Sequence, residues 1–196
     1  MTSDRETVNV YARKAEEFAN LPVAEEQTLA LDMFCAGLKP GAHILDLGSG
    51  PGLHTLELMN RGFTARAIDA TPEFVEAARA NGVDAHLGTF DDLTEENAYD
   101  GIWASFSLLH APRADFPRHI AACKRALRDG GCLFLGLKLG TGEKRDDLGR
   151  FYSFYAEEEL RDILTDAGFD RLQSQTGKGK GLAGTIDPFI LMTAHA

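Results

Sequence analysis

Short apolar runs alternate with amphipathic stretches along most of this 196-residue chain. Apolar runs of about four to eight residues between Gly, Asn or Asp residues predict buried strands, and apolar residues at three-to-four spacing predict helices. On these grounds we expect strands over residues 43–47, 64–69, 83–87, 99–105, 132–137, 169–174 and 188–193. Helices are expected over residues 8–19, 24–37, 53–60, 72–80, 114–127 and 157–167.

This alternation favours an α/β fold in which helices cover both faces of a parallel sheet. In the second predicted helix, Leu29, Met33 and either Cys35 or Ala36 recur at the spacing of a side that faces the core. Two stretches, 140–155 and the glycine-rich 177–184, lack either pattern and are expected to be irregular. The chain length fits a single domain.

Three closely spaced glycines, Gly48, Gly50 and Gly52, follow the first predicted strand and the acid Asp46. Glycines allow a sharp turn and a close approach of a ligand to the backbone, and the helix that follows offers unpaired N–H groups. A dinucleotide site requires G-x-G-x-x-G, with a glycine where this chain has Leu53. A carboxylate at Asp46 would repel a pyrophosphate and attract a cation, so this loop favours a positively charged ligand.

Asp69 ends the next predicted strand, where a carboxylate accepts hydrogen bonds from the two ribose hydroxyls of a nucleoside. Dinucleotide enzymes use the same device, so Asp69 alone indicates only a nucleoside. Together with Asp46 it favours a positively charged nucleoside. A tight strand-to-helix turn without a ligand is the alternative, and it would need neither acid.

Four segments, in order, resemble the motifs of class I S-adenosylmethionine-dependent methyltransferases. They are 44–52 (motif I), 67–73 (the acidic motif that follows it), 99–110 (motif IV) and 126–134 (the approach to the fifth strand). The resemblance implies a three-layer Rossmann-like fold with a mostly parallel seven-stranded sheet and an antiparallel last strand. It also implies S-adenosyl-L-methionine as cofactor and S-adenosyl-L-homocysteine as product.

The same resemblance divides the single methyltransferase domain, residues 1–196, into four parts. Residues 1–38 form an N-terminal helical cover, 39–139 the cofactor-binding core, 140–156 a lid, and 157–196 a C-terminal helix and strands. Tyr11 in the first helix matches a position that covers the cofactor in many family members, and a packing role for its ring stays open.

The cofactor site is expected to extend beyond the loop. The resemblance places adenine after the third strand, where Thr89 replaces the usual Asp. Asp91 is then expected to bind the adenine amine. Phe90 either offers its backbone N–H or its ring to adenine, or packs in the core. Open α/β sheets bind ligands at the carboxyl ends of their strands. The expected cofactor residues are Tyr11, Asp46, Gly48, Ser49, Gly50, Gly52, His54, Asp69, Ala70, Thr71, Thr89, Phe90, Asp91, Ala104, Ser105 and Phe106.

His110 and three residues of the 140–156 lid are the candidates for the methyl acceptor. A histidine titrates near neutrality, so His110 is either a general base or a brace for the next helix. Arg150 suits a planar anionic group, with Tyr152 and Tyr155 beside it. The alternative is that the lid aromatics, Tyr155 among them, pack the lid onto the sheet.

The formal net charge of −10 and the sequence pI of about 5.0 oppose binding to a phosphate backbone. We therefore expect a small-molecule acceptor, although residues 150–160 are similar to tRNA wobble-uridine methyltransferases. A non-catalytic cofactor-binding domain is the third hypothesis. The N-terminus is polar, no apolar run has the length of a membrane span, and the three cysteines match no metal or disulfide pattern. These features predict a cytoplasmic protein without a bound metal.

Overall fold

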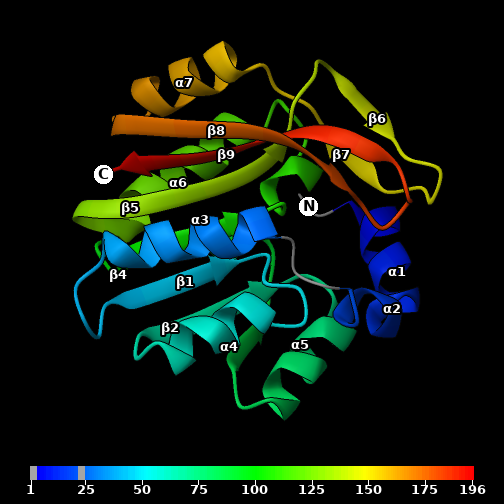
Figure 1. Cartoon of the computed structure of the whole chain (residues 1–196), viewed down its shortest axis with the longest axis horizontal. Coiled ribbons are helices and arrows are strands. Elements are labelled where there is room, and N and C mark those ends of the chain that lie inside the picture. The colour runs from blue at the N-terminus through cyan, green and yellow to red at the C-terminus, as the bar shows by residue number, and fades with distance from the viewer. Residues whose placement is uncertain (1–3, 22–24) are drawn as a thin grey trace.

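The computed structural model describes residues 4–21 and 25–196, and it is built around one seven-stranded sheet (Figure 1). The strand order is β3-β2-β1-β4-β5-β9-β8. The strands are β1 (His43–Leu47), β2 (Thr64–Asp69), β3 (Asp84–Leu87), β4 (Tyr99–Ser105), β5 (Leu127–Lys138), β8 (Asp170–Lys180) and β9 (Ile186–His195). β1 to β5 run parallel, whereas β9 is antiparallel to both β5 and β8. The predicted fold class is confirmed.

Helices cover both faces of the sheet. α3 (Glu25–Ala36), α4 (Leu53–Asn60) and α5 (Pro72–Ala80) pack on one face, and α6 (Phe116–Ala126) and α7 (Glu157–Asp166) on the other. The alternation of side chains in β1 divides the core: Ile44 belongs to the cluster under α3, and Leu45 to the cluster under α6. The remaining helical elements are α1 (Arg5–Arg13), α2 (Ala15–Ala19) and the short 3₁₀ helices η1 (Phe90–Asp92) and η2 (Leu108–His110).

The predicted boundaries of β1, α4, β2, α5 and β4 agree with the structure residue for residue. Other boundaries differ. The first predicted helix is two helices that meet at Lys14, and β5 begins directly after α6, at Leu127. Ala24, where the second predicted helix begins, lies outside the described residues.

The predicted core-facing side of α3 is wrong. Leu29 and Met33 are 51% and 64% exposed, whereas Leu31 and Phe34 are buried. The helix carries apolar residues on more than one side, so spacing alone did not select between them. Gly101 in β4 makes the selection, because a Cβ at that position would lie 2.7 Å from Cζ of Phe34. The missing side chain leaves room for the Phe34 ring.

The first half of the predicted glycine-rich loop is strand, since β8 continues to Lys180 and β9 begins at Ile186. Gly177 pairs with Phe189, and a Cβ on Gly177 would lie 2.5 Å from Cζ of that ring. The glycine therefore lets the ring lie across the strand. The stretch over 140–155 holds a small hairpin of β6 (Glu143–Arg145) and β7 (Phe151–Ser153).

None of the helices in the described parts of the chain combines the length and the apolar character that a membrane crossing requires.

Candidate functional site

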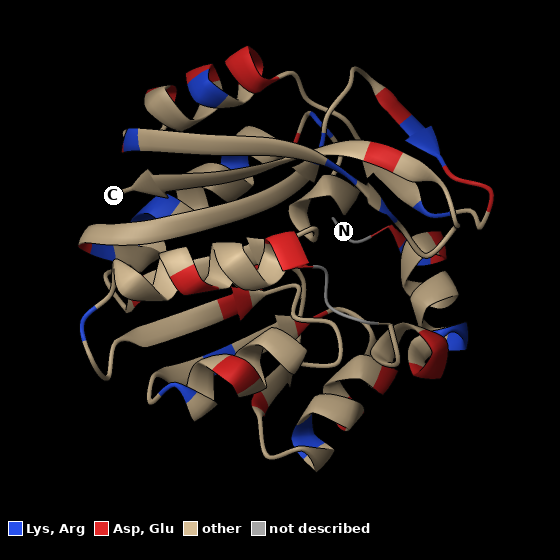
Figure 2. Cartoon of the chain, viewed as in Figure 1, with Lys and Arg blue, Asp and Glu red and all other residues tan. Residues whose placement is uncertain are grey.

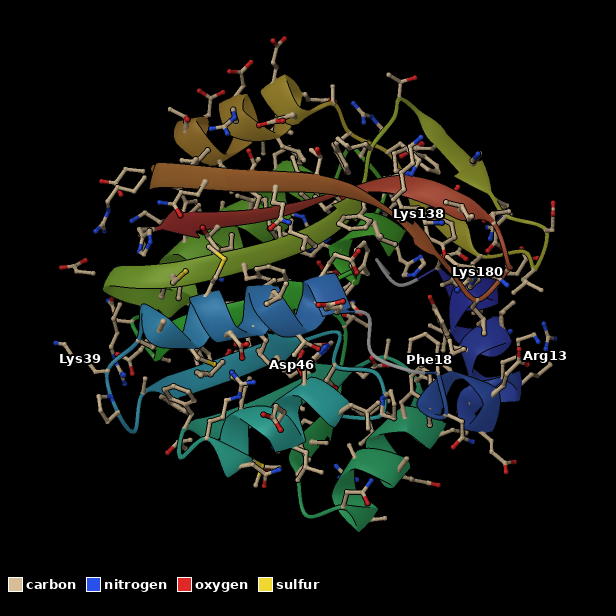
Figure 3. All side chains as sticks on the ribbon, in the orientation of Figure 1. Arg13, Phe18, Lys39, Asp46, Lys138 and Lys180 are labelled. Atoms are coloured by element: carbon tan, nitrogen blue, oxygen red, sulfur yellow. The ribbon has the colours of Figure 1, made fainter. Side chains whose placement is uncertain are left out.

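A cavity of about 360 Å³ opens at the carboxyl ends of the central strands. Its floor is formed by the ends of β1, β2 and β4, and its walls by α1, α2, β7 and the tips of β8 and β9. In Figure 3, Phe18, Lys138 and Lys180 lie on the side of the molecule where α1 and α2 pack, and all three line the cavity. Segments from both ends of the chain therefore enclose one site.

The glycine loop forms one end of the cavity. Gly48 has a φ of 76°, and a Cβ there would lie 2.3 Å from Cβ of Ser107. This residue must be glycine for both reasons. Gly50 and Ser49 line the cavity, and the ring of Phe18 lies over Gly50, at 3.4 Å from the position of an added Cβ. The N-terminal helices thus cover the loop directly.

Asp46 and Asp69 lie at this end of the cavity, and both line it. Asp46 is 2% exposed and accepts a hydrogen bond of 2.6 Å from Oγ1 of Thr55. Asp69 accepts hydrogen bonds of 2.8 Å from the backbone N–H groups of Gly50 and Thr71. Thr71 therefore meets Asp69 through its backbone, and its hydroxyl makes no cap to α5.

Burial raises the pKa of Asp46 to about 7, opposed by the hydrogen bond from Thr55 and assisted by the nearby charge of Asp69. Burial also raises the pKa of Asp69. Among the described residues, neither carboxylate forms an ion pair. Buried carboxylates are normally paired, so this end of the cavity is complementary to a positively charged ligand.

Of the three predicted site residues in the turn after β3, two line the cavity and one does not. Thr89 caps η1: its backbone N–H donates to Asp92 at 2.7 Å, and its hydroxyl oxygen accepts from the N–H of Asp91. Thr89 and Phe90 line the cavity, and the Phe90 ring packs edge-on against His119, with centroids 5.5 Å apart. The Asp91 side chain pairs with Arg118 and does not line the cavity.

The end of β4 lies at the middle of the cavity. Ser105 and Phe106 line it, while Ala104 is fully buried in the core on the opposite side of the strand. Oγ of Ser105 accepts a hydrogen bond of 3.2 Å from Nε2 of Gln27 in α3. Phe106 has a φ of 53°, an uncommon conformation for a residue with a side chain. Such strain is typical of functional sites.

Tyr11, His110, Arg150 and Asp146 form one hydrogen-bonded network on the far wall. Nδ1 of His110 lies 2.6 Å from the carbonyl oxygen of Phe151, so Nδ1 carries the proton and donates. Nε2 is then an acceptor, and the Tyr11 hydroxyl donates to it at 2.9 Å. Arg150 donates from Nη1 to the Tyr11 oxygen at 3.0 Å, and from Nε and Nη2 to Asp146 at 2.9 and 2.6 Å.

This network determines what His110 and Arg150 are able to do. Desolvation lowers the pKa of His110 to about 4, partly opposed by the Phe151 carbonyl and reinforced by the charge of Arg150. The imidazole is therefore neutral near pH 7, with both nitrogens engaged. Arg150 is 2% exposed and its guanidinium is held by Asp146 and Tyr11. Both residues line the cavity, but their polar atoms are already partnered.

Most of the predicted site residues line the cavity, including Tyr11, His54, Ala70 and Tyr152. Four do not: Gly52, Asp91, Ala104 and Tyr155. Gly52 is the N-cap residue of α4, and an added Cβ there would lie 2.9 Å from Cβ of Ala78. The Tyr155 ring packs on Phe116 with centroids 4.5 Å apart and is 1% exposed. The structure therefore places Tyr155 in the core beneath the lid, as in the packing alternative.

Several cavity residues were missed by sequence reasoning. They come from segments without a motif: Phe18, Gln27, Phe74, Lys138, Lys180, Asp187 and Phe189. For Lys138 a signal existed, because it follows the predicted strand 132–137 as Ser105 ends the preceding one. The others reach the cavity through the packing of α2, α3, α5 and the β8–β9 hairpin. Lys180 is exposed as well as cavity-lining.

Comparison with known proteins supplies a family and relatives. Residues 44–131 match a family described as a methyltransferase domain. The ubiquinone biosynthesis O-methyltransferase of Xanthomonas oryzae pv. oryzae (strain PXO99A) is 37% identical over 103 residues, which make up 48% of this chain and 42% of the relative. The matched region thus spans less than half the length of that relative.

Solved structures share the whole fold at low sequence identity. The Burkholderia thailandensis 1,6-didemethyltoxoflavin-N1-methyltransferase, solved with 1,6-didemethyltoxoflavin and S-adenosylhomocysteine, superposes with a TM-score of 0.78 at 22% identity, covering 97% of this chain and 87% of that one. The [4+2]-cyclase SpnF superposes with a TM-score of 0.75 at 19% identity, covering 100% and 97%. At these identities the likeness establishes the fold.

Proposed function

Because this chain belongs to the class I S-adenosylmethionine-dependent methyltransferases, we propose that it transfers a methyl group from S-adenosyl-L-methionine to a small-molecule acceptor. The observation that carries this proposal is the pair of acids without a cationic partner at the glycine loop, the buried Asp46 and the half-buried Asp69. A sulfonium nucleoside with a methionine ammonium supplies both the positive charge and the ribose hydroxyls that such a pair would bind.

In this proposal, different residues at this end of the cavity bind different parts of the cofactor. Asp69 takes the ribose hydroxyls, and it already orders the loop through Gly50 and Thr71. Asp46 faces the methionine ammonium, directly or through water. Phe90 and the backbone after β3 hold adenine, with Thr89 committed to capping η1. Phe18 and Tyr11 cover the cofactor from the N-terminal helices.

S-adenosyl-L-methionine supplies a methyl carbon that an acceptor atom displaces in line from sulfur. The protein then has to align the acceptor and exclude water, which are the main contributions of a protein to this type of reaction. α1 and the lid hairpin form the cover together: Thr7 Oγ1 accepts from the N–H of Phe151 at 2.8 Å, and Arg145 pairs with Asp4 at 2.7 Å. We therefore propose residues 1–38 and 140–156 as a joint cover over the core 39–139.

A small acceptor also follows from what surrounds the cavity. The turn between β8 and β9 adds Leu182 to the walls, β9 adds Phe189 and β7 adds Tyr152, so the acceptor would be largely enclosed. Figure 2 shows Lys and Arg positions interspersed with Asp and Glu over most elements. The net charge of −10 adds to the argument against a polynucleotide acceptor. The curated relative's O-methyltransferase name and the toxoflavin-type substrate of the structural neighbour are consistent with a ring compound.

The test is a methylation screen with methyl-labelled S-adenosyl-L-methionine against a metabolite extract and, separately, bulk tRNA. We expect cofactor-dependent label in the small-molecule fraction and none in tRNA. Label in tRNA would instead support a wobble-uridine type of enzyme. Cofactor binding without label in either fraction would support a non-catalytic cofactor-binding domain. The Asp69→Ala variant is the negative control, and Asp84→Ala, at the exposed start of β3, is its matched control.

A further inference from the structure

β5, β7, β9 and η2 line the acceptor end of the cavity. A positively charged side chain that was not among the predicted catalytic residues lies there. Arg150 and His110 were the expected anion-binding group and base, but each of their side-chain nitrogens bonds within the Tyr11 network and Arg150 is only 2% exposed. Of the Lys and Arg residues that line the cavity in the described chain, this leaves Lys138 and Lys180. Lys180 is exposed at the end of β8, whereas the Lys138 side chain is only 14% exposed.

Lys138 is held in place from two sides. Its Nζ donates to Oδ2 of Asp187 at 2.7 Å and lies 4.1 Å from the ring centroid of Tyr152. An ammonium has three N–H donors, and Asp187 is the one hydrogen-bond partner of Nζ that the described residues provide. Thr185 also donates to Asp187, at 3.0 Å. The side chain is therefore positioned without using all its donors.

The walls beside Lys138 are aromatic. Phe189 is its partner in the β5–β9 ladder, so the two side chains share a face of the sheet. The Phe189 ring meets the ring of Phe106 edge-on, with centroids 5.9 Å apart, and Tyr152 lies under the ammonium. Phe106 follows directly after β4 and also lines the cavity. A flat ring with one acidic group would fill this space.

We propose that Lys138 binds the acidic oxygen or ring nitrogen of a planar aromatic acceptor and holds it as the anion that receives the methyl group. The inference rests on the proposed function. In this scheme no side chain acts as general base. The acceptor gives its proton to water, its anionic atom forms a bond to the methyl carbon, and the carbon–sulfur bond breaks with its electron pair left on sulfur.

The charged and titratable groups around Lys138 come from four elements. They are Asp187 on β9, Tyr152 on β7, His110 on η2 and, acting through Asp187, Lys144 on β6. His110 is neutral near pH 7, and burial raises the pKa of Tyr152, so neither changes charge between pH 5 and 8. Asp187, whose pKa is lowered by Lys138 and Thr185 against the effect of burial, stays ionised across the same range. None of these groups around Lys138 therefore changes charge in the range where the ligand titrates.

The experiment uses 4-nitrophenol, whose anion absorbs visible light and whose neutral form does not, with the full chain saturated by S-adenosyl-L-homocysteine. We expect the bound dye to ionise at least about one pH unit below the free dye, because a cation within hydrogen-bonding distance favours the anion. The methyl ether 4-nitroanisole, which has no acidic proton, should bind more weakly. Lys138→Met should return the ionisation midpoint to that of the free dye, and Lys138→Arg should keep most of the shift.

Lys144→Met is the matched control. Lys144 acts on the same Asp187 but does not line the cavity, so its removal should leave the midpoint at the wild-type value. Retained affinity of Lys138→Met for S-adenosyl-L-homocysteine shows that this variant is folded. Each of three results would overturn the proposal: no dye binding, an unshifted midpoint in the wild type, or a shift that is lost in Lys180→Met rather than in Lys138→Met. Failure of wild type to bind S-adenosyl-L-homocysteine overturns the proposed function itself.

Discussion

The two ends of the cavity are built in different ways. At the cofactor end, Asp46, Gly48 and Gly50 come from one loop, and Asp69 ends the neighbouring strand in the sheet. At the acceptor end, Tyr11 bonds to His110 across 99 positions and to Arg150 across 139. Lys138 meets Asp187 across 49 positions. The first end is local in sequence, and the second is assembled by packing.

This difference determines what each end tolerates. A local loop depends on backbone conformation, so a single added methyl group disrupts it. An assembled network spreads its free energy over several hydrogen bonds between distant elements, so removal of one hydroxyl weakens it by a moderate amount. Variants at the two ends should therefore differ in size of effect, and they provide direct tests of the contrast.

The largest effect is expected for Gly48→Ala. The new Cβ would lie 2.3 Å from Cβ of Ser107 at a φ of 76°, so both the clash and the left-handed conformation oppose it. We expect the free energy of unfolding to fall by at least about 2 kcal/mol, with loss of measurable cofactor binding. Chemical denaturation and calorimetry provide the measurements. Gly62→Ala, at a φ of 88° in open space, should lose only about 1 kcal/mol; equal losses in both variants would refute the role of the clash.

Asp69→Ala should come next. The variant loses the carboxylate proposed for the ribose hydroxyls and the two loop hydrogen bonds from Gly50 and Thr71. Affinity for S-adenosyl-L-methionine should fall by more than roughly tenfold, as measured by isothermal titration calorimetry. Asp84→Ala on β3, where the carboxylate pairs with the exposed His86, should bind with wild-type affinity. Near-normal affinity in Asp69→Ala would remove this residue from the site.

Asp46 should make cofactor binding depend on pH. Its raised pKa, about 7, means that the free protein holds a proton that a cationic ligand would expel. Affinity for S-adenosyl-L-methionine should therefore fall about tenfold from pH 8 to pH 6, and calorimetry in buffers of different ionisation enthalpy should detect proton release. Asp46→Asn should flatten this dependence.

The raised pKa of Asp46 also makes the free energy of unfolding of the unliganded protein depend on pH. The contribution of Asp46 to folding is fully present below its unfolded pKa near 3.8 and is lost as pH rises through about 7. At pH 8 the unliganded Asp46→Asn protein should therefore be more stable than wild type, by about 1 to 3 kcal/mol. A variant that is less stable at pH 8 would contradict the desolvated carboxylate.

The smallest effect belongs to the acceptor end. Tyr11→Phe removes one hydroxyl that donates to His110 and accepts from Arg150. We expect the free energy of unfolding to fall by about 1 kcal/mol, with cofactor affinity nearly unchanged. Thermal denaturation and calorimetry test both statements. A loss as large as that of Gly48→Ala would show that the two ends do not differ as described.

The elements with strong local signals were predictable. β1, α4, β2 and β4 were identified to the residue because apolar runs and glycines delimit them. The buried side of α3 was not, because it is selected by the space above Gly101, which lies in a strand far along the chain. The strand pairing through Gly177 was hidden for the same reason: the glycine was interpreted as a loop signal, and the Phe189 ring that requires it lies in the partner strand.

The sequence by itself determined the order of strands and helices and the glycine loop with its two acids. Those features depend on backbone preferences and hydrophobic spacing within a few residues. Only the tertiary structure decided that Arg150 and His110 are held in a network, that Tyr155 belongs to the core, and that Lys138 faces the cavity beside Phe189. Hydrogen bonds and ring contacts between distant segments exist only after the sheet has brought those segments together.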